Sequence, residues 1–278
     1  MSSTTVPAAT DTSRDKTIPF SVVRDTLAVA QRNLITYRRV PQLLVFSTIQ
    51  PVIFVLMFTY VFGGAIQLPP GFKYPYIDYL MPGIFIQTVV FGSLAAAIGL
   101  ATDLKSGLLE RFRSLPMARS AVLTGRTLGD LVRNVFVVIL MLIVGFMVGF
   151  RFHCSFVAAI GGCLLVLIFG FSMSWIFATV GLIVGDPETA QAAAFPILAP
   201  LVFASSAFVP VSTMPSWLQG WAEHQPVSVT CNAVRALFTG YTAPGSTTTS
   251  LVIQSLAWAV GILLVFAPYA VRVYRRKV

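Results

Sequence analysis

Few residues in this chain have side chains suited to metal binding or redox chemistry. The sequence holds three cysteines (Cys154, Cys163 and Cys231) and two histidines (His153 and His224), with no Cys-x-x-Cys pair. A zinc site needs about four such ligands at regular spacing, so we expect no metal site. The spacing leaves open a disulfide between Cys154 and Cys231, should both lie outside the membrane. Three unrelated cysteines is the simpler interpretation.

Sequence motifs for catalysis are also missing. No glycine directly precedes a lysine, so the phosphate-binding loop Gly-x-x-x-x-Gly-Lys-Ser/Thr is absent. Neither Gly-x-Ser-x-Gly nor His-Glu-x-x-His occurs. We therefore expect no catalytic residue, no bound cofactor and no ATP site in this chain, which is not predicted to be an enzyme by itself. The serine pairs Ser172/Ser174 and Ser205/Ser206 are expected to pack or to hydrogen-bond between helices.

One charged loop, 103–133, has a composition typical of a docking element. Asp103 can cap a short helix, and Pro116 ends it, because the residue before a proline is pushed out of the α-region. An apolar stripe of leucines and Phe112 lies among lysine, glutamate and arginine side chains. This mixture suits a partner protein. A solvated connector whose basic residues only set the orientation of the chain in the membrane is an equally good interpretation.

The elements that position these residues are membrane helices. Hydrophobic residues make up 56% of the 278 residues and charged residues only 10%, whereas soluble domains carry about 25% charged residues. The mean hydropathy is +0.82. A net charge of +9 would suggest nucleic acid in a soluble protein. Here basic residues at cytoplasmic helix ends explain it, so we expect no nucleic-acid partner.

Six apolar segments are long enough, at about 17–25 residues, to be read as spans. They lie at about 42–63, 80–102, 134–150, 156–184, 190–209 and 250–271. The third is short, so its helix is expected to begin near Thr127. None carries a charged residue well inside it, which argues against proton or sodium coupling. Residues 1–17 are predicted to be a disordered cytoplasmic tail, followed by a single transmembrane domain over 18–278.

Basic residues set the predicted orientation. With a cytoplasmic N-terminus, all of the 19 lysines and arginines except Lys73, Arg151 and Arg235 lie inside. Both termini are then cytoplasmic in a bacterial-type cell membrane. Apolar residues at helical spacing over 20–39 predict an amphipathic interfacial helix in contact with membrane lipids. Its basic residues are Arg24, Arg32, Arg38 and Arg39.

The outer loop 210–250 is predicted to contain two short helices. Trp217 and Trp221 share a helical face and mark a membrane interface. Pro226 near the start and Gly240 at the end frame the second helix, which carries Arg235. Such half-helices are tolerated at membrane depth only where protein or a water cavity covers them. They either shape the exit of a pathway or serve as a packing plug.

Four stretches together resemble the type-2 permeases of ATP-binding-cassette exporters, in particular the daunorubicin-resistance branch. Each motif is weak alone, but their order and spacing from about Phe20 to the end make a strong combined match. They are Gln50–Gly64, Tyr79–Gly83, Glu110–Arg119 and the interrupted run from Phe208 through Pro226 to Asn232–Leu237.

This resemblance implies an all-α integral membrane protein with six transmembrane helices, the interfacial helix, a cytoplasmic coupling helix and two extracytoplasmic re-entrant helices. Two permease copies, or this chain and a paralogue, would pair with separate nucleotide-binding ATPase subunits that hold ATP and Mg²⁺. Many relatives have Asn-Pro where this chain has Gln225-Pro226. The residues predicted to couple to the ATPase are Lys105, Glu110, Arg111, Phe112, Arg113, Leu115, Pro116 and Arg119, and those of the re-entrant helices are Trp217, Trp221, Pro226 and Arg235.

The branch further implies export of an amphipathic drug, natural product or lipid. Candidate polar residues on its path are Gln50, Gln87, Ser205 and Ser206, although these could equally hold helices together. Three alternatives stay open at this point. They are a permease for polysaccharides, whose path would be lined by aromatic rings, a membrane scaffold subunit that does not transport, and an autonomous intramembrane enzyme.

Overall fold

The computed structural model describes residues 41–107 and 119–277, with side chains from residues 48 and 123 onward in these two ranges. Within this part of the chain the regular elements are all helices, in line with the all-α prediction. They are α2 (Pro41–Leu56), the π-helix η1 (Met57–Phe62), α3 (Tyr76–Gly92), α4 (Leu94–Lys105), α6 (Arg119–Val148), α7 (Phe156–Val184), α8 (Pro187–Phe203), the 3-10 turn η2 (Val211–Thr213), α9 (Ser216–His224), α10 (Pro226–Thr239) and α11 (Thr248–Lys277).

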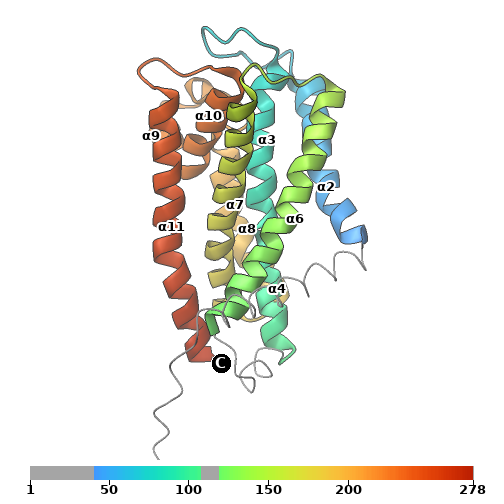
Figure 1. Ribbon diagram of the computed structural model, residues 1–278, viewed down its shortest axis with the longest axis vertical. Coiled ribbons are helices and arrows are strands. Elements are labelled where there is room, and N and C mark those ends of the chain that lie inside the picture. Colours follow the sequence, from blue (N-terminus) through green and yellow to red (C-terminus); the bar gives the residue numbers. More distant parts are fainter. Residues whose placement is uncertain (1–40, 108–118, 278) are drawn as a thin grey trace, which may run out of the picture.

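The helices form an elongated bundle around α7, which packs against α3, α4, α6, α8, α10 and α11 (Figure 1). We call the end that carries α9, the loop 63–75 and the loop 240–247 the upper end, and the end where α11 finishes the lower end. Ser155 caps the start of α7 by accepting a hydrogen bond from the backbone of Ala158, and Gly185 ends it at a φ of 77°. Glycine is favoured there because this left-handed conformation brings a side chain into conflict with the backbone.

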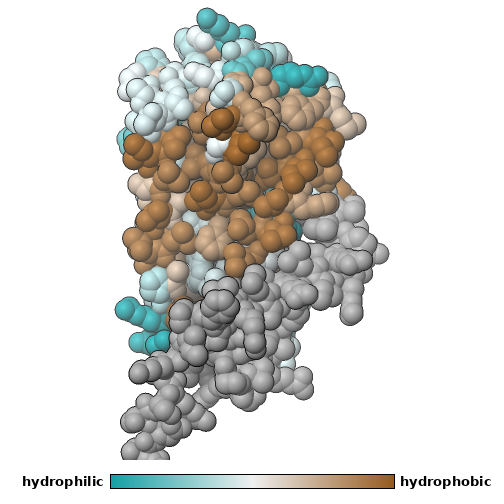
Figure 2. All heavy atoms as spheres, viewed as in Figure 1, coloured by the Kyte–Doolittle hydropathy of each residue, from teal (hydrophilic) through white to brown (hydrophobic). Residues whose placement is uncertain are grey.

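On the face seen in Figure 2, a wide apolar band lies between more hydrophilic ends of the bundle. Four helical stretches of the described chain are long and apolar enough to cross a membrane, judged by length and composition: Tyr76–Lys105, Leu123–Val148, Phe156–Val184 and Thr248–Lys277. These correspond to the second, third, fourth and sixth predicted spans. The first predicted span is helical as α2 and η1, which follow each other from Pro41 to Phe62, and the fifth is helical as α8, which has 17 residues. Four of the six predicted spans meet the length and composition criterion, so the six-span arrangement stays a prediction.

Several boundaries differ from those expected. The second span begins earlier, at Tyr76, and is interrupted at Ser93 between α3 and α4. The third begins at Arg119 rather than near Thr127. The fifth ends at Phe203 instead of continuing to 209, for reasons given below. Asp103 was expected to start a helix, but it lies near the end of α4, where Gly107 with a φ of 67° turns the chain.

The expectation that no charged residue lies well inside a span is wrong for the third one. Arg126, Asp130 and Arg133 follow one another at spacings of four and three on α6, and Asp130 and Arg133 are buried. The sequence pattern places Arg133 just before the predicted span, in the cytoplasmic loop. In the structure α6 begins earlier, so that Arg133 lies inside the helix and is buried in the bundle. The argument against ion coupling that rested on this absence is therefore lost.

Two glycines of the facing helices receive the arginines of α6. The guanidinium of Arg126 lies over Gly99 and that of Arg133 over Gly92, so a side chain at either glycine would displace it. Arg126 also forms an ion pair of 2.6 Å with Asp103, and Arg133 donates a hydrogen bond to the Gly92 carbonyl. Gly92 and Gly99 are seven residues apart, and so are Arg126 and Arg133. A spacing of seven keeps the two members of each pair on one face of their helical stretch. We call this contact the arginine–glycine seam.

Three predicted segments lie outside the described residues: the tail 1–17, the interfacial helix with Arg24, Arg32, Arg38 and Arg39, and most of the coupling segment. For that segment the unplaced residues are Glu110, Arg111, Phe112, Arg113, Leu115 and Pro116. Arg119 opens α6, where the structure describes the backbone alone.

Candidate functional site

The polypeptide leaves helical geometry after α8 and runs through 204–210 without regular structure. Pro196 and Pro200 lie inside α8 and lack the N–H groups that a helix uses for its backbone bonds. The carbonyls freed at the helix end need other donors, because residues around it, such as Val202 and Ser205, are buried away from solvent. The side-chain amide of Gln225 supplies one to the Leu201 carbonyl at 3.0 Å. We call 204–210 the unwound segment.

Helix α10 meets the unwound segment with a row of polar side chains. Gln225, Ser228, Asn232 and Arg235 are spaced by three, four and three residues, which places them on one face. The Ser206 backbone N–H donates to the Ser228 hydroxyl at 2.9 Å, and the Ser206 hydroxyl donates to Asn232 Oδ1 at 2.9 Å. The helix begins where predicted, with Gln225 as its cap and Pro226 in its first turn, and ends at Gly240 with a φ of 72°.

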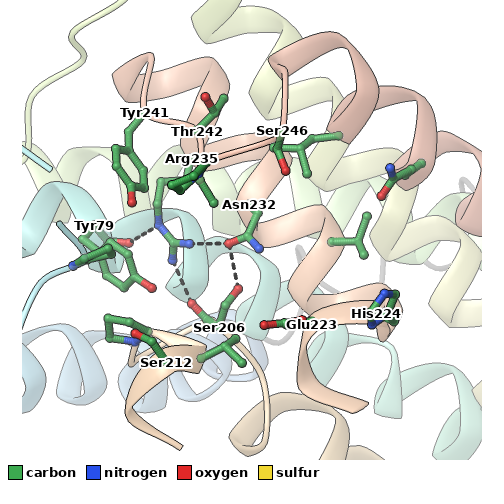
Figure 3. A pocket seen from close by; sticks show the side chains of 18 of the residues that line it. Tyr79, Ser206, Ser212, Glu223, His224, Asn232, Arg235, Tyr241, Thr242 and Ser246 are labelled. Atoms are coloured by element: carbon green, nitrogen blue, oxygen red, sulfur yellow. Dashed lines mark hydrogen bonds between the residues drawn. The ribbon is translucent and has the colours of Figure 1, made fainter. Parts of the chain in front are cut away.

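Arg235 is the centre of these contacts and is only 2% exposed. Its Nε donates to the Tyr79 carbonyl at 3.1 Å, its Nη1 to Asn232 Oδ1 at 2.6 Å and its Nη2 to the Ser206 carbonyl at 2.8 Å (Figure 3). The guanidinium carbon also lies 3.6 Å from the centre of the Tyr79 ring, a cation–π contact. One side chain thus joins α3, the unwound segment and α10.

A cavity of about 940 Å³ opens beside this group at the upper end. Arg235, Asn232 and Ser206 border it together with Tyr79 and Tyr241, and Figure 3 shows their side chains converging there. The opposite wall is formed by Leu251, Gln254, Ala257 and Trp258 of α11, with Glu223 and His224 at the end of α9. The cavity therefore combines one buried cation with aromatic and apolar surface, which is the usual make-up of a small-molecule site.

Helix α3 approaches the unwound segment closely. A side chain at Gly83 would meet the backbone of Ala207, so glycine permits this contact. The hydroxyl of Tyr76 donates to the Phe208 carbonyl at 2.8 Å. The sequence motif Tyr79–Gly83, chosen for its resemblance to a family, therefore holds the irregular backbone in place.

Aromatic rings cover the other side of the unwound segment. Phe58 of η1 stacks on Phe208 with centroids 4.6 Å apart, and Phe54 and Phe203 join them at 5.7 and 5.8 Å from Phe208. A shallow hollow of about 470 Å³ lies next to this cluster and is bordered by Ala204 among others. The unwound segment thus separates an apolar hollow on one side from the Arg235 cavity on the other.

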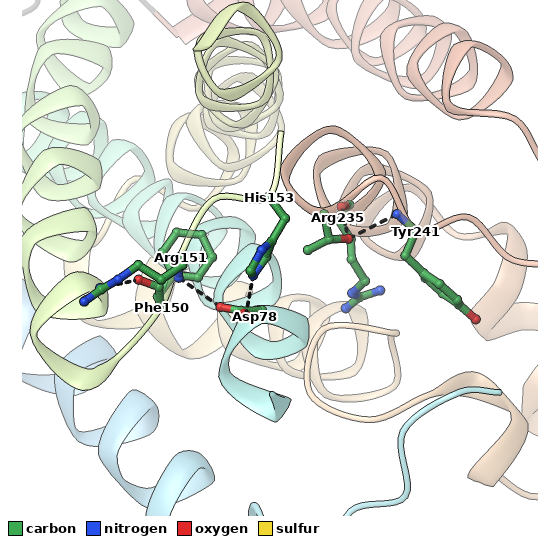
Figure 4. A network of polar contacts seen from close by, with 7 residues as sticks. Asp78, Phe150, Arg151, His153, Arg235 and Tyr241 are labelled. Atoms are coloured by element: carbon green, nitrogen blue, oxygen red, sulfur yellow. Dashed lines mark hydrogen bonds and ion pairs between the residues drawn. The ribbon is translucent and has the colours of Figure 1, made fainter. Parts of the chain in front are cut away.

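A second polar group fixes the upper end of α3. The Asp78 carboxylate is buried and accepts hydrogen bonds from the Arg151 backbone N–H at 3.0 Å and from His153 Nε2 at 2.8 Å (Figure 4). The His153 ring stacks on Tyr74 with centroids 3.7 Å apart. These contacts hold the loop between α6 and α7 against the α3 N-terminus, where a negative charge is also favoured by the helix dipole.

The structure brings together only part of the predicted path. Ser205 and Ser206 are both buried in the unwound segment, whereas Gln50 is exposed on α2. Gln87 is buried in α3, and its Oε1 has no hydrogen-bond partner among the described residues. These contacts assign no transport role to the four residues, so their place on a path stays a prediction.

The remaining predicted residues lie at the bundle surface. Trp217 and Trp221 of α9 are 78% and 44% exposed, as an interfacial role requires. Lys105 forms an ion pair of 2.7 Å with Asp186, the cap of α8. Hydrogen bonds from Lys105, then from the backbone and hydroxyl of Thr189, lower the pKa of Asp186 from 3.8 to about 2. Lys105 is therefore engaged within this chain.

The cysteines are free thiols, with Cys231 buried beside Arg235 Nη2 at 3.3 Å and Cys154 partly exposed. The disulfide left open from the sequence is not formed in the structure. Among the described residues no group of three or more histidine, cysteine or acidic side chains is placed to hold a metal ion.

Sequence reasoning missed Asn232, Ser228, Gln225 and Tyr79 as members of the site. The polar spacing of three, four and three along α10 was available as a signal. The helix was predicted only from the residues that begin and end it, Pro226 and Gly240, and from its one charged residue, Arg235, so this polar spacing was not used. The carbonyl partners of Arg235 could not be found in this way, since every residue carries a carbonyl.

Comparison with known proteins agrees with this architecture. Residues 24–239 match the family described as ABC-2 type transporter. The chain is 35% identical over 257 residues to the daunorubicin resistance ABC transporter permease protein DrrB1 of Streptomyces coeruleorubidus, covering 92% of this chain and 88% of the relative. It is 28% identical to the probable doxorubicin resistance ABC transporter permease protein DrrC of Mycobacterium tuberculosis, covering 91% and 89%. It is 24% identical to the putative transport permease ycf38 of Cyanophora paradoxa, covering 79% and 76%.

The family match covers most of the chain, and it includes α3, the unwound segment and α10, which build the Arg235 group. The helical bundle with its apolar band has the form that such a membrane protein requires. The chain therefore belongs to the ABC-2 type transporter family and is a multi-pass membrane protein.

Proposed function

We propose that this chain is the transmembrane permease subunit of an ATP-driven exporter for amphipathic drugs, natural products or lipids. The observation that carries this proposal is the drug-sized cavity of about 940 Å³ in a chain that belongs to the ABC-2 type transporter family. The cargo class is supported by relatives whose names refer to daunorubicin and doxorubicin resistance. The mixed aromatic, apolar and polar lining suits molecules of this kind.

A separate ATPase would supply the energy. On this proposal two nucleotide-binding subunits hold ATP and Mg²⁺ and bind the cytoplasmic segment that includes Glu110 and Arg111. A second copy of this chain, or a paralogue, completes the pathway. ATP binding closes the two ATPase subunits, and the coupling segments move the helices from an inward-open to an outward-open state.

The proposed orientation places the lower end in the cytoplasm and the upper end outside. The exposed basic residues Arg272, Arg275, Arg276 and Lys277 at the end of α11 support it, since basic residues concentrate on the cytoplasmic side. The Arg235 cavity is then close to the exit. Cargo from the inner leaflet or cytoplasm would reach it after the permease changes state.

The first test is purification of the tagged chain from its native membranes in a mild detergent. A nucleotide-binding subunit that co-purifies, and that drives daunorubicin or lipid flux in proteoliposomes with ATP, is the expected result. A chain that purifies alone and supports no flux with any co-expressed ATPase contradicts the proposal and favours a scaffold or an enzyme.

A pair of double variants tests the coupling segment. Glu110→Ala with Arg111→Ala should leave the permease in the membrane and lower ATP-dependent flux about tenfold, because a coupling free energy of ~1–3 kcal/mol corresponds to about 5–150-fold. Arg272→Ala with Arg275→Ala is the matched control, since these exposed residues lie at the same end of the bundle. Equal flux and equal assembly in the two double variants would refute this role.

A further inference from the structure

The charge of Arg235 is not neutralised by a carboxylate. Among the residues that the structure describes, no acidic side chain lies within ion-pair distance of it, although it is only 2% exposed. A buried charge without an opposite charge is costly, so its surroundings need to compensate for it. The charge that remains exerts an attraction on any anion that enters the adjoining cavity.

Its hydrogen bonds compensate only in part. Four of its five N–H groups have acceptors in the described chain: the Tyr79 and Ser206 carbonyls, Asn232 Oδ1 and Cys231 Sγ. These acceptors are neutral, and so is the Tyr79 ring that contributes the cation–π contact. One N–H of Nη1 therefore remains for an acceptor in the cavity, and an ionised acceptor would bind it more strongly than a neutral one.

The rest of the cavity suits an apolar body. Leu251, Ala257 and Trp258 of α11 line it opposite Arg235. Ala257 and Trp258 are exposed and belong to the apolar stretch Thr248–Lys277, which is long enough to cross a membrane, so this wall suits contact with lipid-like molecules. The volume of about 940 Å³ falls within the range of about 300–1,000 Å³ that is typical of small-molecule sites.

We propose that this cavity binds an acidic amphipathic molecule, with a carboxylate or phosphate beside Arg235 and the apolar part along α11. The proposal rests on the proposed function, because it names the chemical class that an exporter permease would hold here. Glu223 lines the same cavity with an exposed carboxylate and opposes the binding of an acid. Replacing it therefore changes affinity in the opposite direction to replacing Arg235.

Binding can be measured on the permease alone in phosphatidylcholine nanodiscs. The reporter is the fluorescence of Trp258 in a Trp175→Phe, Trp217→Phe, Trp221→Phe background, which leaves it as the single tryptophan, and the probes are brominated dodecanoate and its methyl ester. The acid should quench saturably and at least about tenfold more tightly than the ester. Arg235→Gln should abolish this preference, and Gln254→Phe, which fills part of the cavity without adding a second fluorescent reporter, should weaken the binding of both probes.

A second pair of variants keeps the test valid if Arg235→Gln does not fold. Glu223→Gln should tighten acid binding about two- to fivefold and leave the ester unchanged. Glu188→Gln removes the same charge from an exposed site in the first turn of α8 and is the matched control. The proposal is overturned if acid and ester bind equally, or if Glu223→Gln behaves like Glu188→Gln, because Arg235 would then serve only to hold the unwound segment.

The acidic molecule could be a membrane phospholipid or a smaller acid, and nanodiscs with and without phosphatidylglycerol distinguish the two. Phosphatidylglycerol that competes with dodecanoate assigns the cavity to membrane phospholipid, whereas dodecanoate binding that is insensitive to phosphatidylglycerol assigns it to smaller acids. Binding is measured without an ATPase, so a loss of ATP-driven flux with intact binding contradicts the proposed function and leaves this inference standing.

Discussion

The substitution Gly83→Ala tests the close approach between α3 and the unwound segment. A methyl group at this position would overlap the carbonyl oxygen of Ala207 and crowd its Cα. These atoms belong to the backbone, so they cannot move aside by a change of rotamer. Ala207 is fully buried, and the neighbouring Ser206 is tied to α10 by its N–H, hydroxyl and carbonyl groups.

The expected loss follows from two opposing effects. Insertion of one extra carbon into a well-packed interior costs ~1–3 kcal/mol. Alanine in place of glycine favours a helix by ~0.5–1 kcal/mol. Because the overlap is with backbone atoms that cannot move aside, the packing cost lies at the upper end of its range, and the net decrease in the free energy of unfolding is about 2 kcal/mol. At about 2–4 °C per kcal/mol for a chain approaching this size, the Tm should fall by about 4–8 °C.

The assay is thermal unfolding of the purified permease in detergent, with Gly161→Ala as the matched control. Gly161 lies inside α7, and a Cβ there would meet no atom within 4 Å. Its replacement should leave the Tm unchanged or raise it slightly. If Gly83→Ala melts within about 1 °C of Gly161→Ala, the contact between α3 and the unwound segment is wrong, and with it the site geometry described above.

Three further predictions concern the ion pair, the α10 row and the thiols. Because Lys105 lowers the folded-state pKa of Asp186 from 3.8 to about 2, the stabilisation from the pair should be fully present above pH 3.8 and lost as the pH falls through about 2; the Tm difference from Asp186→Asn should therefore stay constant between about pH 7 and 5 and shrink below 4. Ser228→Ala leaves a buried backbone N–H of the unwound segment without its acceptor and should lower the free energy of unfolding by ~1–3 kcal/mol in denaturant titrations, whereas an unchanged midpoint would contradict this hydrogen bond. An impermeant maleimide applied to intact cells should label Cys154, although burial raises the pKa of its thiol, and should not label Cys231; labelling of Cys154 only after the membrane is opened would reverse the proposed orientation.

Features that depend on local chain chemistry were accessible from the sequence. The fourth span agrees with α7 at both ends, because Ser155 can cap a helix and Gly185 can end one. The second re-entrant helix was predicted from Pro226 and Gly240 for the same reason. Apolar runs located the other helices, since lipid requires apolar side chains over the length of a span.

Features that depend on contacts between distant segments were not accessible. Arg235 was assigned to an outer loop, because a single arginine between apolar residues gives no sign of the Tyr79 and Ser206 carbonyls that receive it. The end of α8 was placed too late, because 204–210 carries no charged residue and includes the apolar Phe208 and Val209, so that nothing in its composition marks the point where the backbone turns. Arg133 was taken as the boundary of a span, although Gly92 provides it with a buried site.

The arginine–glycine seam has a consequence for how this protein enters the membrane. A charged side chain near the centre of a lone helix costs about 2.5–3.5 kcal/mol during insertion, and Asp130 and Arg133 approach the middle of the apolar stretch Leu123–Val148, whereas Arg126 lies near its start. Gly92 and Gly99 expose backbone to which these arginines can dock only when α3 and α4 are already beside α6. We therefore expect the nascent chain to retain its second span at the translocon until the third emerges, so that the two leave as a helical pair. Their order of synthesis would then matter as much as their hydrophobicity.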